Sequence, residues 1–390
     1  MKSKVNTDEK KIDELLSRGV EDVIIRESLK KKLLSGRELR VKMGIDPTGP
    51  KIHLGRAVAL RKLAKFQELG HKIVLIVGDF TALIGDASDK LEKRPMLTVA
   101  EVKKNMKDYK SQLGKIIDLK KAEFHYNSKW LKKLNALDLS ELAESFSVLQ
   151  MSNRRNFKDR LDKGEEVSLR EFLYPLYQGY DSVAVKADVE IGGFDQLFNL
   201  KAGRIVQKHY HMSEQDILTI EMLEGTDGRK MSTSWGNIIT VVDEPTDMFG
   251  KVMSVRDELV PKYFKLCTDM ETPPVGNPKE IKMKLAREIV KIYHGEKKAE
   301  EAEQSFINTF QKKEIPENIE EIQVAKGESL ADVLVNNKIL SSKGEWRRLV
   351  EGRGAHDLLK NENISDPTLK VNENMTLKIG KKRFLKIIVK

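Results

Sequence analysis

Two short segments combine glycines, basic side chains and hydroxyls in patterns that suit phosphate binding. The first, GIDPTGPKIHLGR, covers residues 44–56, and the second, GRKMSTS, covers residues 228–234. In the first, a turn rich in Pro and Gly leads into a helix that opens near His53, where unpaired N–H groups and the helix dipole favour an anion. His53 can donate to a phosphate oxygen, and Gly55 leaves room for a nucleotide. On its own, the segment also fits an ordinary turn with a surface histidine.

The second segment follows an apolar, strand-like run at residues 218–223 and carries Arg229, Lys230 and several hydroxyls. It can therefore close over a polyphosphate, although a lone basic loop is usually only solvated. Together the two segments can flank one nucleotide from opposite sides. The pair resembles the two signature motifs of the class I aminoacyl-tRNA synthetases, and that resemblance implies ATP as a substrate.

The elements around the first segment form a βαβ pattern. A strand ends near Gly44, residues 57–69 have apolar positions at helical spacing, and Gly70 can end that helix. Residues 72–78 (KIVLIVG) are a continuous apolar run, which is typical of a buried parallel strand. We therefore expect an α/β protein with a Rossmann-like parallel-sheet catalytic domain and an N-terminal helical extension over residues 1–240.

A later helix carries three polar side chains on one face. A capping-box pattern at residues 168–171 begins it, and the helix is expected to bend or adjust locally at Pro175. Tyr174, Gln178 and Asp181 lie at i, i+4 and i+7, so a phenol, an amide and a carboxylate share that face. A buried structural hydrogen-bond network is one interpretation of such a face.

The segment after this helix favours a ligand instead. Residues 187–192 (ADVEIG) predict a short strand, and the turn that follows contains Gly193 and Asp195. A glycine there lets a ribose come close, and the aspartate is an acceptor suited to ribose hydroxyls at the carboxyl edge of a parallel sheet. The stretches YPLYQGYD and IGGFDQ resemble the tyrosine-binding helix and ribose-binding turn of the tyrosyl-tRNA synthetases.

This resemblance implies a role for each matching residue. Asp181 accepts from the substrate phenol, and Tyr174 and Gln178 hold the α-ammonium group. The implied tyrosine site comprises Thr81, Asp86, Asn127, Tyr174, Gln178, Asp181 and Gln196. The implied ATP site comprises Gly44, Asp46, His53, Gly55, Gly193, Asp195 and Lys230. The implied catalytic set comprises Thr48, His53, Arg56, Lys90, Arg94, Lys230 and Thr233.

The implied reaction is attack of the tyrosine carboxylate on the α-phosphate of ATP, followed by transfer of tyrosine to the terminal adenosine of tRNA(Tyr). The first step needs alignment and cationic donors rather than a side-chain nucleophile, because the carboxylate is already ionised. Mg²⁺ is expected to be held mainly by the phosphates, so we assign no protein ligand for a metal.

The chain departs from the family pattern at three positions. Arg56 stands where the first motif usually has a second histidine, and Thr233 where the second motif commonly has a second lysine. Lys42 occupies a strand end where some members place a tyrosine that touches the phenol. Two alternatives therefore remain open: a catalytically weakened RNA-binding relative, and a tryptophanyl-tRNA synthetase, against which Asp181 and the stretch QGYD argue.

The C-terminal part is more basic than the rest. We expect an α-helical domain at residues 241–313, a linker at 314–326 and, by resemblance, an S4-like RNA-binding domain at 327–390. That last segment has 13 Lys and Arg against 8 Asp and Glu, a net charge of +5. Basic residues there suit RNA phosphates, although a solvated face explains any one of them. The expected tRNA contacts are Arg347, Arg348, Lys381, Lys382 and Arg383.

Composition limits the remaining possibilities. The formal net charge of +10 suits a polyanionic partner, and the single cysteine, Cys267, excludes an intrachain disulfide framework and a cysteine-built zinc site. Neither an apolar run of eighteen residues nor an apolar signal core is present, so a cytoplasmic location without membrane contact is expected. The family resemblance also implies a homodimer.

Overall fold

The computed structural model describes residues 5–86, 96–270, 276–310, 319–352, 354–360, 362–380 and 383–390. The chain divides into two compact units, Met1–Glu300 and Glu301–Lys390. Within the described ranges, no helix combines the length and the apolar character needed to cross a bilayer.

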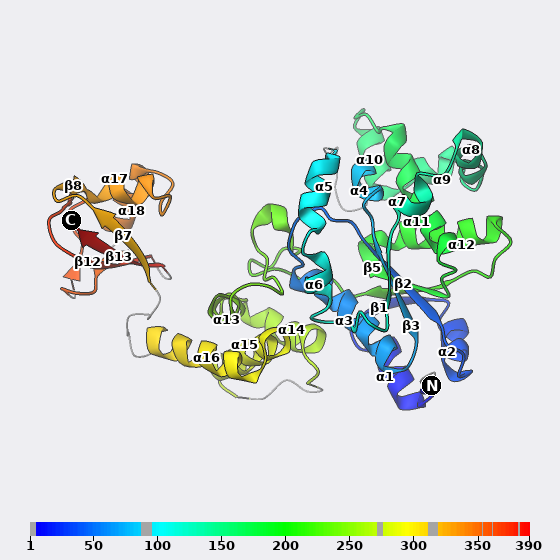
Figure 1. The fold of residues 1–390 in the computed structure, drawn as a ribbon, viewed down its shortest axis with the longest axis horizontal. Helices are drawn as coiled ribbons and strands as arrows, with labels where there is room; N and C mark the ends of the chain where they lie inside the picture. Colours follow the sequence, from blue (N-terminus) through cyan, green and yellow to red (C-terminus); the bar gives the residue numbers. More distant parts are fainter. Residues whose placement is uncertain are drawn as a thin grey trace. The chain divides into compact units, whose positions relative to one another are not determined.

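A six-stranded sheet lies at the centre of the first unit, in the order β1-β6-β5-β2-β3-β4 (Figure 1). Strand β1 is antiparallel to β6, and the other neighbours pair in parallel. The mostly parallel sheet confirms the expected α/β class. The strands are β1 (Val20–Ile24), β2 (Arg40–Ile45), β3 (Lys72–Val77), β4 (Glu123–Tyr126), β5 (Val189–Gly193) and β6 (Asp216–Ile220).

The order of the strands reverses between β2 and β5. From β2 the chain continues through helix α3 to β3 and then β4 on one side, whereas β5 leads to β6 on the other side. In open parallel sheets, ligands bind outside the carboxyl ends of the strands at such a reversal. The residues that follow β2 and β5 are therefore placed to form a binding site.

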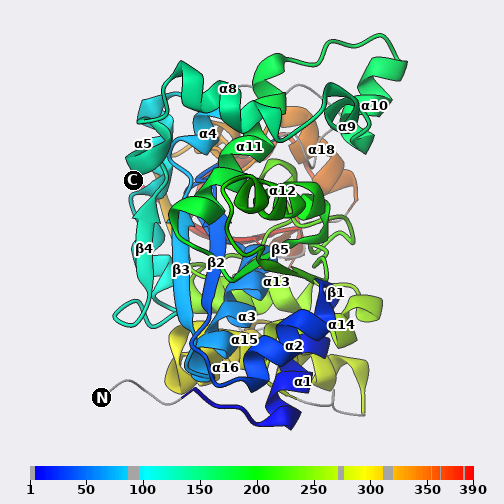
Figure 2. The same ribbon diagram turned by 90° about the vertical axis from the view of Figure 1, so that its right-hand side faces the viewer.

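Helices surround this sheet (Figures 1 and 2), with α3 packed on β3 and β5 and α12 packed on β5 and β6. The helices of the first unit, the last of which continues into the second, are α1 (Glu9–Ser17), α2 (Arg26–Leu34), α3 (Leu54–Glu68), α4 (Thr81–Ile84), α5 (Val99–Met106), α6 (Tyr109–Leu113), α7 (Ser128–Leu131), α8 (Ala136–Glu144), α9 (Val148–Ser152), α10 (Arg155–Asp162), α11 (Leu169–Ala184), α12 (Leu197–His209), α13 (Pro245–Met253), α14 (Val260–Cys267), α15 (Pro278–His294) and α16 (Glu296–Phe310). Short 3₁₀ turns lie at Phe194–Gln196, Thr233–Trp235 and Asp257–Leu259.

The predicted βαβ unit is present as β2, α3 and β3, and α11 begins with the predicted capping box and contains Pro175. Strand β6 covers Asp216–Ile220 rather than the expected 218–223. It ends earlier because the residues after it turn toward the second motif, where the Met231 N–H donates to the carbonyl of Leu223 at 3.3 Å.

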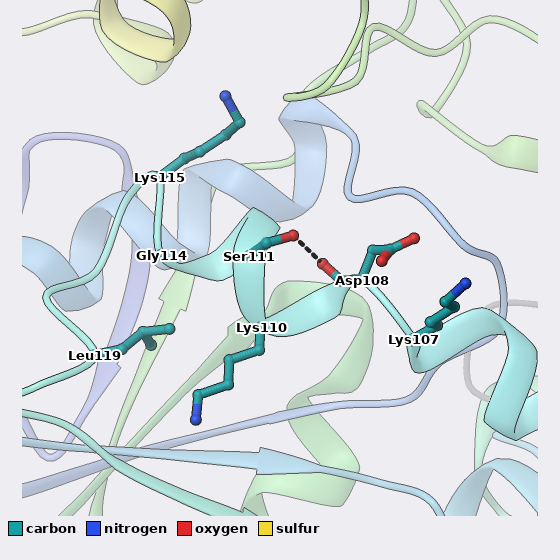
Figure 3. Close-up of a pocket in the computed structure, with 7 residues that line it drawn as sticks. All are labelled: Lys107, Asp108, Lys110, Ser111, Gly114, Lys115 and Leu119. Carbon is teal, nitrogen blue, oxygen red and sulfur yellow. Dashed lines mark hydrogen bonds between the residues drawn. The ribbon is translucent and has the colours of Figure 1, made fainter.

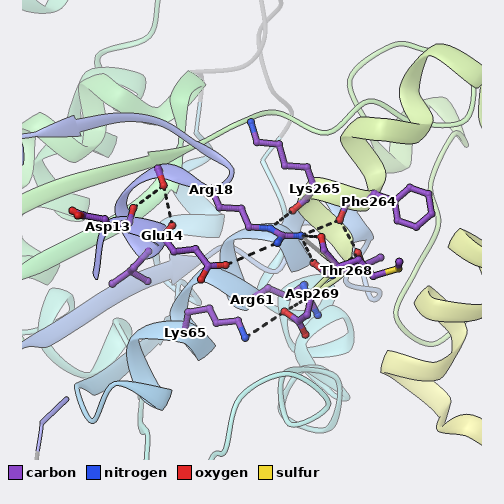
Figure 4. A network of polar contacts seen from close by, with 12 residues as sticks. Asp13, Glu14, Arg18, Arg61, Lys65, Phe264, Lys265, Thr268 and Asp269 are labelled. Carbon is purple, nitrogen blue, oxygen red and sulfur yellow. Dashed lines mark hydrogen bonds and ion pairs between the residues drawn. The ribbon is translucent and has the colours of Figure 1, made fainter. Parts of the chain in front are cut away.

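Helices α13 to α15 belong to the same compact unit as the sheet. A network of ion pairs and backbone contacts connects the end of α14 to α1 and α3 (Figure 4). The Arg18 guanidinium, next to the end of α1, donates to the carbonyls of Lys265 and Thr268, both at 3.1 Å. Arg61 and Lys65 of α3 pair with Asp269 at 2.9 and 3.3 Å. The helix that begins at the first motif is therefore tied to the end of α14. Cys267, the last residue of α14, is buried, as expected for a small apolar side chain.

The second unit contains a five-stranded sheet in the order β10-β9-β12-β13-β7 and a short β11-β8 pair. Its elements are β7 (Glu320–Val324), β8 (Glu328–Ser329), α17 (Leu330–Asn336), α18 (Lys343–Glu351), β9 (Ala355–Asp357), β10 (Glu362–Asn363), β11 (Lys370–Val371), β12 (Met375–Ile379) and β13 (Arg383–Val389). The prediction of a linker at 314–326 is partly wrong, because Glu320–Val324 is a strand that pairs in parallel with β13. Alternation places Ile322 and Val324 in the core of this unit, around Trp346.

Candidate active site

The carboxyl end of β2 carries a half-buried carboxylate at the centre of a hydrogen-bond network. Asp46 accepts from the Thr81 hydroxyl at 2.7 Å through Oδ1, and from the Tyr174 hydroxyl at 3.0 Å through Oδ2. Burial raises the pKa of Asp46 to about 6. Burial and the nearby Asp46 raise the pKa of Tyr174 well above its ordinary value, so this phenol remains a hydrogen-bond donor.

The same network continues to a second carboxylate, that of Asp181 on α11. Asn127 Nδ2 donates to Thr81 Oγ1 at 3.0 Å and to Asp181 Oδ2 at 3.2 Å, and Trp130 Nε1 donates to Asp181 Oδ1 at 2.7 Å. Burial raises the pKa of Asp181 to about 7, although Lys42 and these two donors oppose the shift. A continuous chain of polar contacts thus joins Tyr174 to Asp181, two of the residues predicted to bind one ligand.

A third carboxylate lies beside the turn after β5. Gln196 Nε2 donates to Asp86 Oδ2 at 3.5 Å, and Asn199 Nδ2 donates to Asp86 Oδ1 at 3.2 Å. Arg154 Nη2 in turn donates to Asn199 Oδ1 at 3.0 Å. The predicted pair Asp86 and Gln196 is therefore brought together, through α12 as well as through the turn itself.

His53 begins α3, the helix that follows the first motif. Its Nδ1 atom is buried and has no hydrogen-bond partner among the residues that the structure describes. Burial, together with the charges of Arg56 and Lys230, lowers the pKa of His53 to about 3. The imidazole is therefore neutral at physiological pH, and it can act as a hydrogen-bond donor without carrying a charge.

Arg56 lies one turn into the same helix and points back to the motif turn. Its Nη2 donates to Thr48 Oγ1 at 2.7 Å, and its Nη1 donates to the Tyr109 hydroxyl at 3.2 Å. The Tyr109 hydroxyl in turn donates to the Gly49 carbonyl at 2.6 Å. The unusual arginine is thus held against Thr48, a residue predicted to meet a phosphate.

The two motifs meet in the folded chain. The Leu54 N–H donates to the Ile239 carbonyl at 2.8 Å, just beyond the second motif, and the Gly55 N–H donates to Met231 Sδ at 3.3 Å. A Cβ at Gly49 would lie 3.8 Å from the Thr233 side chain. Two of the three departures from the family pattern, Arg56 and Thr233, therefore border the same turn.

The second motif also reaches the turn after β5. Lys230 Nζ pairs with Asp195 Oδ2 at 2.7 Å, with about one third of each side chain exposed. Arg229 pairs instead with Asp227 at 2.6 Å and stacks on Trp235 with 4.7 Å to the ring centroid. Of the two basic side chains, Lys230 is the one directed to the predicted ribose site.

The predicted glycines differ in their surroundings. A Cβ at Gly193 would lie 2.4 Å from Asp195 Oδ1, and one at Gly55 would lie 3.1 Å from the His53 ring. A Cβ at Gly44 would meet no atom of the described residues within 4 Å, apart from the chain neighbours of Gly44. As far as the described residues go, the space beside Gly44 is open to a ligand.

The predicted contacts with tRNA are only partly described. Arg347 and Arg348 are exposed on α18, and Arg383 is exposed at the start of β13, where it donates to the Ile339 carbonyl. The remaining predicted basic residues lie outside the described ranges: Lys90, Arg94, Lys381 and Lys382.

Several residues of the site had no clear sequence signal. Tyr109 and Asn199 come from α6 and α12, far along the chain from the groups that they contact, and Glu190 reads as one polar residue in a buried strand. The sequence could have indicated Trp130, because it lies three residues after Asn127 in the stretch NSKW. Gly78 ends the run KIVLIVG, and a Cβ there would lie only 2.0 Å from Asp46 Oδ1.

A cavity of about 590 Å³ lies elsewhere, at the short helix α6 (Figure 3). The side chains of Lys107, Lys110 and Lys115 point in different directions around it (Figure 3). Because these ammonium groups do not converge and none of the residues predicted for the site lines the cavity, it is separate from the network around Asp46.

Comparison with known proteins identifies the class. A family model described as tRNA synthetases class I (W and Y) matches residues 34–311, which include the sheet from β2 to β6 and both motifs. The chain belongs to this family of class I aminoacyl-tRNA synthetases, and it is therefore an enzyme whose class uses ATP.

Curated relatives narrow the family further. The tyrosine–tRNA ligase of Thermotoga maritima is 43% identical over 387 residues, covering 96% of each chain. The tyrosine–tRNA ligase of Dehalococcoides mccartyi is 44% identical over 398 residues, covering 98% of this chain and 100% of the relative. Within the class, the chain belongs with the tyrosyl-tRNA synthetases, which confirms the resemblance seen in the sequence.

Solved structures agree in fold. The C-terminally truncated mitochondrial tyrosyl-tRNA synthetase of Aspergillus nidulans matches with a TM-score of 0.63 and 21% identity, over 77% of this chain and 94% of that chain. The Archaeoglobus fulgidus tyrosyl-tRNA synthetase complexed with L-tyrosine matches with a TM-score of 0.60 and 20% identity, over 76% and 100%. At these identities, the likeness supports the fold.

Gly78 gives a first test of the network. We expect Gly78→Ala to displace Asp46 and Thr81, because the new methyl group would lie 2.0 and 2.2 Å from their oxygens. Overpacking of this kind destabilises by about 1–3 kcal/mol. Tyrosine-dependent pyrophosphate exchange should fall as well, by about tenfold for each 1.36 kcal/mol that the displacement of Asp46 and Thr81 adds to the activation barrier.

The matched control is Gly250→Ala in α13, where a Cβ would meet nothing within 4 Å. Chemical unfolding and exchange assays of both variants check the expectation. Equal behaviour of the two alanine variants would contradict a tightly packed Asp46 and Thr81.

Proposed function

We propose that the chain activates L-tyrosine with ATP to give tyrosyl-adenylate and pyrophosphate, and then transfers tyrosine to the 3′-terminal adenosine of tRNA(Tyr). The observation that carries this proposal is the network from Tyr174 to Asp181, buried where β2 and β5 diverge and bordered by both motifs. Amino-acid-dependent pyrophosphate exchange tests it. Exchange with tryptophan, or with neither amino acid, would support the tryptophan enzyme or a weakened relative instead.

For tyrosine, the proposed phenol acceptor is Asp181. A pocket that rejects phenylalanine needs a buried acceptor that the wrong substrate would leave unpaired; the handling of phenylalanine by tyrosyl-tRNA synthetases is a well-known case of this rule. Tyr174, Gln178 and Asp86 hold the α-ammonium group. Thr81 and Asn127 connect the two ends of the pocket, and Gln196 contacts the tyrosyl group.

For ATP, the proposed contacts follow the two strand ends. Asp195 and Gly193 meet the ribose, the open space at Gly44 and the first motif admit the nucleotide, and Asp46 borders it. One tyrosine carboxylate oxygen bonds to the α-phosphorus, the bond to the bridging oxygen breaks, and pyrophosphate leaves with that electron pair. A ribose hydroxyl of the terminal adenosine then attacks the carbonyl carbon, and AMP leaves.

Donors to the departing pyrophosphate supply most of the catalysis in this scheme. Thr48, His53 and Lys230 are the proposed donors, with Lys90 and Arg94 as further candidates. Arg56 is one turn from His53 and is hydrogen-bonded to Thr48. Its positive charge replaces the charge that is lost where Thr233 stands in place of the usual second lysine. Preorganised donors of this kind act most strongly when charge builds in the transition state.

Mg²⁺ is proposed to bind through the ATP phosphates. The carboxylates that border the nucleotide already have partners, Asp46 in Thr81 and Tyr174, and Asp195 in Lys230. Across the described ranges, no three His, Cys, Asp or Glu side chains form a group that could hold a metal ion. When bound, Mg²⁺ would neutralise charge on the phosphates.

The second unit is proposed to bind the tRNA through backbone and shape. Arg347 and Arg348 are exposed on α18, and Arg383 is exposed on β13. Lys381 and Lys382, which precede Arg383 in the sequence, are proposed as further contacts. A cytoplasmic location remains a prediction from the sequence.

A homodimer is proposed through an apolar face of the first unit. Five large apolar side chains of α8 to α10 and the start of α11 have 44–79% of their surface exposed: Leu137, Val148, Leu149, Leu161 and Leu169. These helices lie close together at one end of the unit (Figures 1 and 2). Exposed apolar side chains on neighbouring helices suit a self-complementary contact with a second copy of the chain.

The phenol assignment predicts a pH dependence. Because the pKa of Asp181 is about 7, its ionised, accepting form grows as the pH rises from 6 to 8, and tyrosine affinity should rise with it. Asp181→Asn should weaken tyrosine binding about tenfold to a hundredfold and remove this dependence. Asp332→Asn, at a half-exposed position of the second unit where the carboxylate pairs with Lys343, is the control for removing one aspartate charge.

The free energy of unfolding should change with pH in the direction opposite to tyrosine affinity. The folded-state pKa of Asp181 lies above its ordinary value of 3.8, so the stability due to its protonated form is lost as the pH rises through about 7. Calorimetric titration with tyrosine and thermal unfolding at several pH values separate the two effects. Unchanged discrimination against phenylalanine in Asp181→Asn would rule out the phenol role.

The role of Lys230 predicts a selective kinetic defect. Lys230→Ala should slow tyrosyl-adenylate formation by about a hundredfold or more, as the loss of one transition-state donor does, and leave tyrosine affinity within about twofold. Pre-steady-state measurement of both quantities checks this, with Lys201→Ala, an exposed position on α12, as the control. Weakened tyrosine binding in Lys230→Ala would instead place Lys230 in ground-state recognition.

The dimer proposal predicts that a charge at its centre breaks the assembly. Leu149→Lys should shift the protein from dimer to monomer in sedimentation velocity, because a buried unpaired ammonium is strongly unfavourable. Leu359→Lys is the matched control, since Leu359 is 59% exposed in the second unit. A wild-type chain that sediments as a monomer would contradict the proposal directly.

A further inference from the structure

A buried ion pair lies directly behind the proposed tyrosine pocket. Lys42 of β2 is opposite Glu190 of β5 in the parallel register, at the point where the strand order reverses. Lys42 Nζ lies 2.9 Å from Glu190 Oε1, and the two side chains are 0% and 1% exposed. Neither residue belongs to the proposed substrate contacts.

Every hydrogen of the Lys42 ammonium has an acceptor. Besides Glu190, it donates to the Gln178 carbonyl at 3.0 Å and to Ser182 Oγ at 2.8 Å. Gln178 and Ser182 are one turn apart on α11, and Asp181 lies between them in sequence. Lys42 therefore anchors the turn of α11 that presents two proposed tyrosine ligands.

Glu190 is saturated as well. Its Oε1 also accepts from Gln178 Nε2 at 3.0 Å, and its Oε2 accepts from Ser182 at 3.2 Å and from Gln215. An ionised carboxylate can only accept, so the Gln178 amide must turn its NH₂ group to Glu190. Its oxygen is then directed away from Glu190, as an acceptor.

We propose that the Lys42–Glu190 pair is a positioning device for substrate recognition, which orients the Gln178 amide so that its oxygen accepts from the α-ammonium group of tyrosine. The proposal rests on the proposed role of Gln178 in the tyrosine site. Lys42 and Glu190 act through Gln178 and do not touch the substrate.

Stability alone is a poor explanation for this pair. Removing two charges from water is costly, and replacing a whole buried ion pair by apolar residues of similar volume is often neutral or stabilising. The charge of Lys42 lowers the pKa of Asp181 and the charge of Glu190 raises it, so the two partners act against each other at the phenol acceptor. The contacts of the pair with Gln178 and Ser182 instead concern the turn of α11 that carries the proposed tyrosine ligands.

The test uses Lys42→Met/Glu190→Met, which removes both charges of the pair and keeps a similar side-chain volume. Two probes are titrated into the full-length protein: tyrosine, and 3-(4-hydroxyphenyl)propionate, which lacks the ammonium group. We expect tyrosine to bind about tenfold to a hundredfold more weakly, the usual range for losing a hydrogen bond to a charged group. The deaminated probe should change by less than about threefold.

Gln178→Ala in both backgrounds completes a double-mutant cycle. In the wild-type background it should selectively weaken tyrosine, and in the Met/Met background it should have little further effect. Equal losses for both probes, or an undiminished effect of Gln178→Ala in the Met/Met background, would overturn the proposal. If Gln178→Ala does not weaken tyrosine in the wild-type background, the assigned role of Gln178 is wrong, and the proposal that rests on it fails too.

Thermal unfolding of each variant identifies any loss of folded protein. Should the Met/Met variant not fold, Glu190→Gln provides the second measurement. Its amide oxygen can still face Lys42 and Gln178, and its NH₂ group can donate to Ser182 Oγ and, once the Gln215 amide turns over, to Gln215 Oε1. Its preference for tyrosine over the deaminated probe should therefore stay within about threefold of wild type. A loss of that preference in folded Glu190→Gln would equally contradict the orientation mechanism.

Discussion

The parallel pairing of β2 with β5 is the constraint on which the rest of the molecule depends. Because the strand order reverses at this pair, the carboxyl ends of the two strands diverge and leave space between them. Asp46 follows one strand and Asp195 follows the other. The two signature segments, nearly two hundred residues apart, each reach this space, and the polar network of α11 lines its base.

Three carboxylates dominate the proposed site, and they differ in their burial and in their partners. Asp46 is half-buried and Asp181 is buried, and the two are joined through Thr81 and Asn127. Desolvation raises the pKa of each toward neutrality, while Asp195 is partly exposed and paired with Lys230. A buried acceptor such as Asp181 is costly to leave short of donors. A substrate that adds a donor to Asp181 is therefore favoured over one that does not, which is the physical basis of selectivity in the proposed scheme.

Local signals predicted much of this arrangement. The apolar run before Gly78, the capping box of α11 and the spacing of Tyr174, Gln178 and Asp181 were sufficient for the βαβ unit and for one polar helix face. Boundaries were less accurate: β6 ends earlier than its apolar run, and Glu320–Val324 joins a sheet instead of a linker. In the first case the turn into the second motif, only a few residues further along the chain, ends the strand. In the second case the deciding partner, β13, is distant in sequence.

By itself, the sequence determined the class of fold, the two motifs and the residue types of the proposed tyrosine site, because periodicity, turns and short motifs are local properties. Only the tertiary structure decided which partner each polar group has. Arg56 bonds to Thr48 and Tyr109, Trp130 reaches Asp181, and Lys42 meets Glu190, because sheet register and helix packing bring these residues together. Such pairings depend on long-range geometry, which no local pattern encodes.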